Sequence, residues 1–189
     1  MSVEIRMADR DDCLAIAGLH YLSHTTSFRA FAQPEWISAR RADEYRTFWC
    51  DYLQDQPAPD RTWVARSRRV VVGTVTIMSL ANSSEHFAPT GRNYESLDEV
   101  ACLRLMYVHP EFQRRRIGSQ LMAQAMKFMN NRGYRMATLI THAENRTARQ
   151  FYEHAGWQLD TIFEGQVEEF HEDPPGMRRR ARYFISLEE

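Results

Sequence analysis

One stretch in the second half of the chain, Leu103–Gly118, limits the possible folds more than any other. It reads LRLMYVHPEFQRRRIG, and its first six residues are mostly apolar, as in an interior strand. Pro110 ends this strand, because proline has no backbone N–H for a ladder and restricts the residue before it. The stretch therefore predicts a strand, then a basic turn, and then a helix that begins near Ile117.

The predicted helix continues from this turn to Asn131. The first turn of a helix has unpaired backbone N–H groups and the positive end of the helix dipole, so it can bind a phosphate group when it is exposed after a strand. The three arginines before the helix can pair with such a phosphate or form a solvated basic turn. Apolar residues recur at helical spacing at Ile117, Leu121, Ala125, Phe128 and Met129.

A second motif, NRTARQFYEHAGW, begins at Asn145 and ends at Trp157. Its apolar residues lie at positions i, i+3, i+4 and i+7, which predicts a helix over Asn145–Ala155. Gly156 then ends the helix, since glycine readily takes the left-handed conformation found after a C-cap. Asn145 is suited to cap the N-terminus, because its side chain can accept from the first free amides.

Together the two motifs resemble those of the GNAT acetyltransferases. After the fourth strand this family carries Gln or Arg, two residues, Gly, one residue, and then Gly or Ala; Gln113 and Gly118 match, whereas Arg116 stands at the first glycine position. The second motif is similar to the family's Asn-x-x-Ala-x-x-aromatic-Tyr-x-x-x-Gly-aromatic run. The resemblance implies an α/β fold, with a mixed, mostly antiparallel, twisted sheet of about seven strands, about four flanking helices and a splay between the fourth and fifth strands.

In this family acetyl-CoA is the co-substrate, and the resemblance implies where it would bind. Backbone N–H groups of the loop would hold its pyrophosphate, and the open fourth strand and Asn145 would hold its pantetheine arm. The side chains of Leu105 and Tyr107 can equally be part of the core. The implied cofactor-binding residues are Met106, Tyr107, Val108, Arg114, Arg115, Arg116, Ile117, Gly118, Ser119 and Asn145.

Tyr152 is the catalytic residue that the resemblance implies. Amide formation from an amine and a thioester leaves a CoA thiolate, and a phenol at the sulfur can donate a proton to it as a general acid. The alternative for Tyr152 is an aromatic side chain packed on the apolar face of its helix. Cys102 is expected to be buried and inert rather than a nucleophile.

The residue that would deprotonate the amine is not evident from the sequence. Some family members keep a glutamate on the fourth strand and others on the fifth, but the matching positions hold Cys102, Arg104 and Ile140. A water chain or a nearby side chain could serve as the base instead. The candidate side chains are Asp98, Glu99 and His142.

The predicted function is transfer of an acetyl group from acetyl-CoA to a primary amine by direct attack in a ternary complex. The main alternative is a non-catalytic acyl-CoA-binding sensor, because the glutamates are missing and Arg116 departs from the motif. The amine can belong to a small molecule or to a protein tail. Acidic residues in and after the long polar segment Ser79–Asp98 favour a cationic acceptor, or they form a solvated acidic loop.

The resemblance also implies that earlier parts of the chain form the walls of the acceptor cleft, although the apolar positions there fit ordinary amphipathic core helices equally well. The segment Ser23–Gln33 has no clear period and is predicted as a loop, and Pro34 suits a first helical position. One long helix or two short ones follow, up to Leu53. Two strands, Thr62–Ala65 and Val70–Met78, form a predicted hairpin, and the long polar segment after them is expected at the mouth of the active site.

A length of 189 residues suits a single domain that spans residues 1–189. The net charge of −1 offers no bulk attraction for nucleic acid, and no apolar run reaches the roughly 20 residues that span a bilayer. The three cysteines are an odd number without paired spacing, which argues against a disulfide framework and suits a reducing, cytoplasmic location. The seven histidines show no metal-ligand pattern. The expected partner is an amine acceptor, and a homodimer stays open.

Overall fold

The structure, a computed structural model, describes residues 3–83, 87–89, 94–164 and 173–187. Its centre is a seven-stranded sheet in the order β1-β2-β3-β4-β5-β7-β6. β4 and β5 run parallel and each other neighbouring pair runs antiparallel, so the predicted mixed, mostly antiparallel sheet is confirmed. The strands are β1 Glu4–Met7, β2 Arg61–Ser67, β3 Val70–Ser79, β4 Val100–Val108, β5 Met136–His142, β6 Gln158–Glu164 and β7 Arg179–Ser186.

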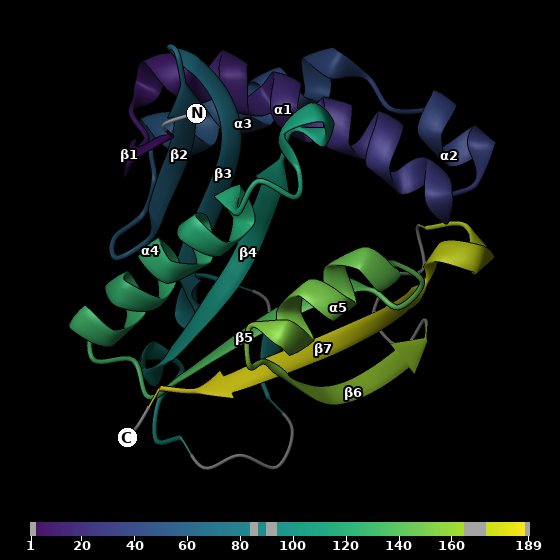
Figure 1. Ribbon diagram of the computed structural model, residues 1–189. Helices are drawn as coiled ribbons and strands as arrows, with labels where there is room; N and C mark the ends of the chain where they lie inside the picture. Colours follow the sequence, from purple (N-terminus) through teal and green to yellow (C-terminus); the bar gives the residue numbers. More distant parts are fainter. Residues whose placement is uncertain (1–2, 84–86, 90–93, 165–172, 188–189) are drawn as a thin grey trace.

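Helices cover both faces of this sheet (Figure 1). The α-helices of the described residues are α1 Cys13–Thr26, α2 Pro34–Ser38, α3 Ala42–Gln54, α4 Ile117–Asn131 and α5 Arg146–His154. In β2, Val64 packs into the apolar cluster of α1 and α3, whereas the next residue, Ala65, packs into the cluster that contains α4. Because consecutive strand residues point to opposite faces, α4 lies on the face opposite α1 and α3.

β4 and β5 part along their length, as the resemblance to the GNAT family implies. Their pairing covers Val100–Cys102 and Met136–Thr138. Figure 1 shows the two strands diverging beyond these residues. The separation leaves backbone groups on the open edge of β4 that a continuous ladder would otherwise use.

Gly73 in β3 marks a close approach between the sheet and α4. A Cβ atom at this position would lie 2.9 Å from Cδ1 of Leu121 and 3.2 Å from Cγ2 of Ile117. A larger residue would push α4 away from the strand, so Gly73 allows the helix to lie tightly on β3.

The predicted loop over Ser23–Gln33 is wrong, because α1 continues to Thr26 and a 3-10 turn follows it. The hydroxyl groups of Ser23 and Thr25 each donate to a carbonyl group one turn earlier, at 2.9 Å. These bonds keep short polar residues inside the helix, although their residue types alone favour a loop. Pro34 begins α2, as predicted.

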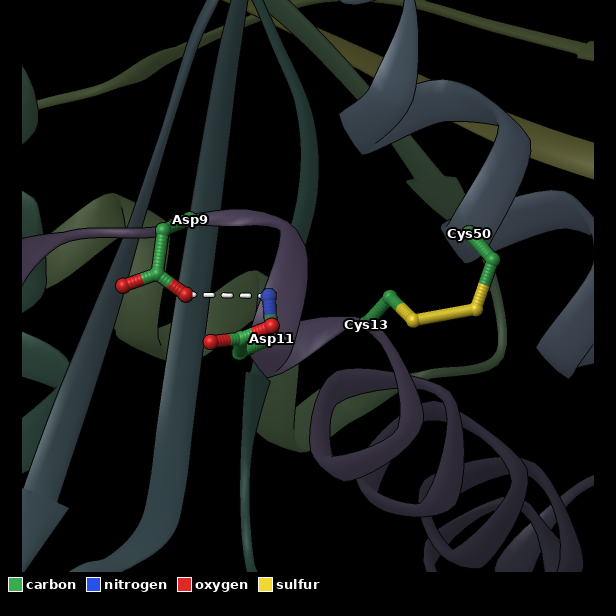
Figure 2. The surroundings of a disulfide bond; sticks show 4 residues. All are labelled: Asp9, Asp11, Cys13 and Cys50. Carbon is green, nitrogen blue, oxygen red and sulfur yellow. Dashed lines mark hydrogen bonds between the residues drawn. A yellow bond between two sulfur atoms is a disulfide. The ribbon is translucent and has the colours of Figure 1, made fainter.

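The argument from the cysteine count against disulfide bonding is also wrong. Cys13 at the start of α1 and Cys50 in α3 form a disulfide, with a Cα–Cα distance of 4.9 Å (Figure 2). The two residues are 37 positions apart in sequence, and the packing of α1 against α3 brings them together. Cys102 is buried and free, as expected. The cysteines therefore give no support to a reducing compartment.

No helix in the described part of the chain is long and apolar enough to cross a bilayer. The same residues contain no group of His, Cys, Asp and Glu side chains that could hold a metal ion.

Candidate active site

A cleft of about 1930 Å³ lies where β4 and β5 separate. One wall comes from α1 and α3, and the other comes from the first turn of α4 and from α5. The segment Ser79–Asp98 contributes Asn82, Ser83 and Phe87 to the lining, as expected, while residues 84–86 and 90–93 lie outside the described part. A pocket for one small ligand has a volume of roughly 300–1000 Å³, so this cleft has room for two substrates.

The turn before α4 has an uncommon backbone shape for its residue types. Arg114 and Arg116 both adopt left-handed conformations, with φ angles of 58° and 61°. Arg116 is the N-cap residue of α4 and makes no side-chain cap. The first turn of α4 lines the cleft, and its uncapped amides are therefore available to a phosphate group.

Most of the predicted loop residues border the cleft, but Arg115 does not. Its guanidinium lies over the ring of Phe112, 5.2 Å from the centroid. Gly118 lies where α4 meets α5, since a Cβ atom there would be 3.3 Å from the ring of Phe151. This glycine therefore sets the distance between the two helices that border the site. The predicted loop residues that line the cleft are Arg114, Arg116, Ile117, Gly118 and Ser119.

The open edge of β4 borders the same cleft through Met106, Tyr107 and Val108. The amide of His109 donates to the carbonyl of Val72 in β3, at 2.9 Å. Because antiparallel bonding alternates along a strand, the amides of Met106 and Val108 point away from β3 and toward the splay. They are placed to bond an extended arm that lies in the splay like an extra strand.

Asn145 joins the end of β5 to α5. Its Oδ1 atom accepts from the amide of Ala148 at 3.1 Å, so the expected N-cap is confirmed. Asn145 also lines the cleft. The cap holds the side chain in one position and leaves its amide nitrogen for another partner.

Tyr152 lines the cleft, and among the described residues its phenol has no hydrogen-bond partner. Its ring packs against Trp157 and Tyr183, and 9% of the residue is exposed. Burial raises the pKa of the hydroxyl above its ordinary value, so the group keeps its proton. No described residue forms a hydrogen bond with this hydroxyl. Tyr152 can therefore be both a packed core aromatic and the candidate general acid, because its ring is buried and the residue also lines the cleft.

A partly buried network of histidines and tyrosines, which the sequence did not reveal, adjoins β4. The hydroxyl of Tyr107 is 2.8 Å from Nε2 of His20 and 3.4 Å from Nε2 of His24. Trp49 donates to Nδ1 of His20 at 3.1 Å, so His20 carries its proton on Nε2. Burial lowers the pKa of His20 to about 2 and that of His24 to about 3, so both rings are neutral. The available signal was their i, i+4 spacing, which places both rings on one face of α1.

The comparisons with known proteins decide the family. The model of the acetyltransferase (GNAT) family matches residues 25–157, which is more than half of the chain. The protein belongs to the GNAT acetyltransferase family. It is 33% identical to an uncharacterised N-acetyltransferase of Methanocaldococcus jannaschii over 67 residues, a match that covers 35% of this chain and 30% of that protein.

Solved structures share the GNAT fold over nearly the whole chain. The PaiA N-acetyltransferase of Thermoplasma acidophilum, in complex with coenzyme A, has a TM-score of 0.73 at 16% identity and covers 98% of this chain and 99% of that one. An N-acetyltransferase of Staphylococcus aureus Mu50 has a TM-score of 0.71 at 18% identity, with 100% of both chains covered. YncA of Salmonella typhimurium, with its cofactor acetyl-CoA, has a TM-score of 0.69 at 15% identity and covers 100% of this chain and 96% of that one.

The acidic residues that the sequence offered as a base for this GNAT protein are not in its cleft. Asp98 lies beside the Ser79 hydroxyl, at 3.4 Å, and Glu99 pairs with a surface arginine at 3.5 Å. His142 does line the cleft. Burial, together with the adjacent Arg180, lowers the pKa of His142 to about 3, which makes it a weak base.

Two other carboxylates, Glu44 of α3 and Glu144 after β5, line the cleft. Oε1 of Glu144 accepts from Arg179 at 3.3 Å. Its Oε2 atom is buried and has no hydrogen-bond partner among the described residues. The sequence signal for Glu144 was its place directly before Asn145, at the end of a strand that borders the splay.

Proposed function

We propose that the protein transfers an acetyl group from acetyl-CoA to a primary amine by direct attack in a ternary complex. The observation that carries this proposal is the hydroxyl of Tyr152, which is protonated, unbonded by described residues and located at the cleft. Membership of the GNAT acetyltransferase family supports it, as do two structural relatives that were solved with coenzyme A or acetyl-CoA.

Acetyl-CoA supplies an acetyl group that is activated as a thioester, and the lining of the cleft fits its chemistry. The amides at the start of α4 suit the pyrophosphate, and the side chains of Arg114 and Arg116 add positive charge beside them. The amides of Met106 and Val108 suit the carbonyl groups of the pantetheine arm. Asn145 can donate its side-chain amide to the same arm.

Tyr152 would act at the sulfur atom. As the amine nitrogen bonds to the acetyl carbon, the carbon–sulfur bond breaks and its electron pair stays on sulfur. The phenol then gives its proton to that sulfur, so that coenzyme A leaves as a thiol. The amine must also lose a proton, and Glu44 and Glu144 are the described cleft carboxylates that can accept it, directly or through water.

The experiment that tests this proposal is acetyl-CoA turnover, followed as free thiol, with a panel of small amines and lysine-containing peptides. We expect Tyr152→Phe to lower kcat by about 100-fold or more at unchanged affinity for coenzyme A, because a placed general acid contributes about 10²–10⁴-fold. Tyr134→Phe is the matched control, since Tyr134 is equally buried but does not line the cleft. Binding of coenzyme A without turnover of any amine would instead favour the non-catalytic sensor.

A further inference from the structure

Arg104 has an unusual position in β4. Thr76 of β3 pairs with Leu105 and the next residue, Ile77, pairs with Leu103, so Arg104 is the extra residue of a β-bulge. Bulges turn a side chain out of the regular alternation and are frequent beside active sites. This one lies directly after the end of the β4–β5 pairing, where the cleft begins.

The side chain of Arg104 is exposed within the cleft. Its guanidinium lies over the buried ring of Phe87, 4.9 Å from the centroid. No hydrogen bond or ion pair joins this guanidinium to any residue that the structure describes. A cation–π contact uses none of the N–H donors of a guanidinium, so the contact with Phe87 holds Arg104 and leaves its donors to an anionic ligand.

Two further charged residues that line the cleft, Arg40 and Glu44, help to determine which molecule can bind beside Arg104. Arg40 is engaged already, since it donates to the carbonyl of Trp36 at 3.2 Å and covers the Trp36 ring at 4.3 Å. Glu44 of α3 is exposed and lines the cleft. Arg104 and Glu44 together complement a molecule that carries an anionic group and an amine, whereas a purely cationic amine would be repelled by Arg104.

We propose that Arg104 is the anion-binding residue of the acceptor site, and that the acceptor is a primary amine that also carries a carboxylate, as an amino acid does. This inference rests on the proposed acetyl transfer and names the acceptor class for it. Aromatic rings line the same side of the cleft and suit an apolar side chain on the acceptor. These rings are Phe28, Phe31, Tyr45, Phe48 and Tyr52.

The test compares amines that differ only in a carboxylate: phenylalanine with phenethylamine, and leucine with 3-methylbutylamine. For each pair, kcat/KM is measured by thiol release, and Kd is measured on protein saturated with coenzyme A. The variants are Arg104→Gln, which removes the charge, and Arg104→Lys, which keeps the charge but not the planar fork. Arg29→Gln is the control, because Arg29 is an exposed arginine of the 3-10 turn after α1 and does not line the cleft.

We expect the wild type and Arg29→Gln to prefer the carboxylate-bearing member of each pair. Arg104→Gln should reduce this preference on the order of 10- to 100-fold, and Arg104→Lys should keep part of it. The ratio is compared between variants, so differences in amine basicity within a pair cancel. A preference that is absent from the wild type, or that survives Arg104→Gln, overturns the proposal.

The binding measurement separates this inference from the proposed function. Carboxylate-selective binding that depends on Arg104, without any thiol release, would support the anion site and refute acetyl transfer. Thiol release with equal use of both members of each pair would support acetyl transfer and refute the anion site.

Discussion

Arg116 is held in a backbone conformation that arginine seldom adopts. Its φ of 61° and ψ of 12° lie in the left-handed region, which costs a residue with a Cβ atom roughly 1–2 kcal/mol. The family motif has glycine at this position, and here the turn has the conformation that glycine favours although the residue is arginine. The chain therefore places a guanidinium beside the candidate phosphate site at a cost in stability.

We expect Arg116→Gly to raise the free energy of unfolding on the order of 0.5–1 kcal/mol, because relief of the left-handed strain exceeds the added freedom of glycine in the unfolded chain. Urea denaturation measures this difference. Arg115→Gly is the matched contrast, since Arg115 is not among the positive-φ residues, and it should lower stability instead. If both variants lowered stability alike, the strain at Arg116 would be refuted.

Asp12 gives the stability of the protein a defined pH dependence. Burial alone would raise its pKa, but hydrogen bonds from Arg6, at 2.7 and 2.8 Å, and from the Asp9 amide lower the pKa below its ordinary value. Since the folded pKa is the lower one, this stabilisation is present above the unfolded pKa of about 4 and is lost as the pH falls through the folded pKa.

Asp12→Asn should therefore lower the free energy of unfolding by about 2 kcal/mol near neutral pH, and the difference from the wild type should shrink below about pH 4. Urea midpoints across this range measure the effect. Asp43→Asn is the control, because Asp43 and its partner Arg41 are each 70% exposed and such pairs contribute little. If the difference in unfolding free energy between the wild type and Asp12→Asn stayed constant with pH, ionisation of Asp12 would not be the source of the stabilisation.

At the scale of the elements, local sequence patterns predicted the helix boundaries that depend on local interactions. α4 begins at Ile117 and ends at Asn131, as predicted, because its apolar stripe and the turn before it are both local features. α1 runs past Ser23, since a serine can cap, break or continue a helix and the surrounding fold decides which. The Cys13–Cys50 pairing depends on two helices that pack together, which no local spacing encodes.

The disulfide connects α1 and α3, which together form one wall of the cleft. In the loop-closure account, a bond between residues 37 positions apart stabilises the folded state by about 3–4 kcal/mol. We expect the double variant Cys13→Ser, Cys50→Ser to lose most of this free energy of unfolding in urea titrations. Dithiothreitol should reproduce the loss in the wild type and have no effect on the double variant. A wild-type urea midpoint that does not change with dithiothreitol would contradict the Cys13–Cys50 disulfide.

In the whole molecule, the candidate site lies between two parts of one sheet, β1 to β4 and β5 to β7, which meet where β4 pairs with β5. The lining that the turn before α4 and Asn145 give to the cleft was predictable, because both belong to short sequence motifs. The lining on the other side was not, because His20, Glu44 and Arg104 come from separate elements and line one cleft only in the fold. The bulge also turns Arg104 in a direction that strand alternation cannot reveal.

We expect coenzyme A to bind at the open edge of β4, between the two parts of the sheet. We expect it to slow hydrogen exchange of the Met106 and Val108 amides by about 100-fold at 100 times its Kd, because these amides would then exchange only after release. NMR resolves the single amides. Adenosine 3′,5′-bisphosphate, which has phosphates but no pantetheine arm, is the control ligand and should protect only the first turn of α4, at Ile117–Ser119. If both ligands protected Met106 and Val108 alike, the strand-like binding of the arm would be wrong.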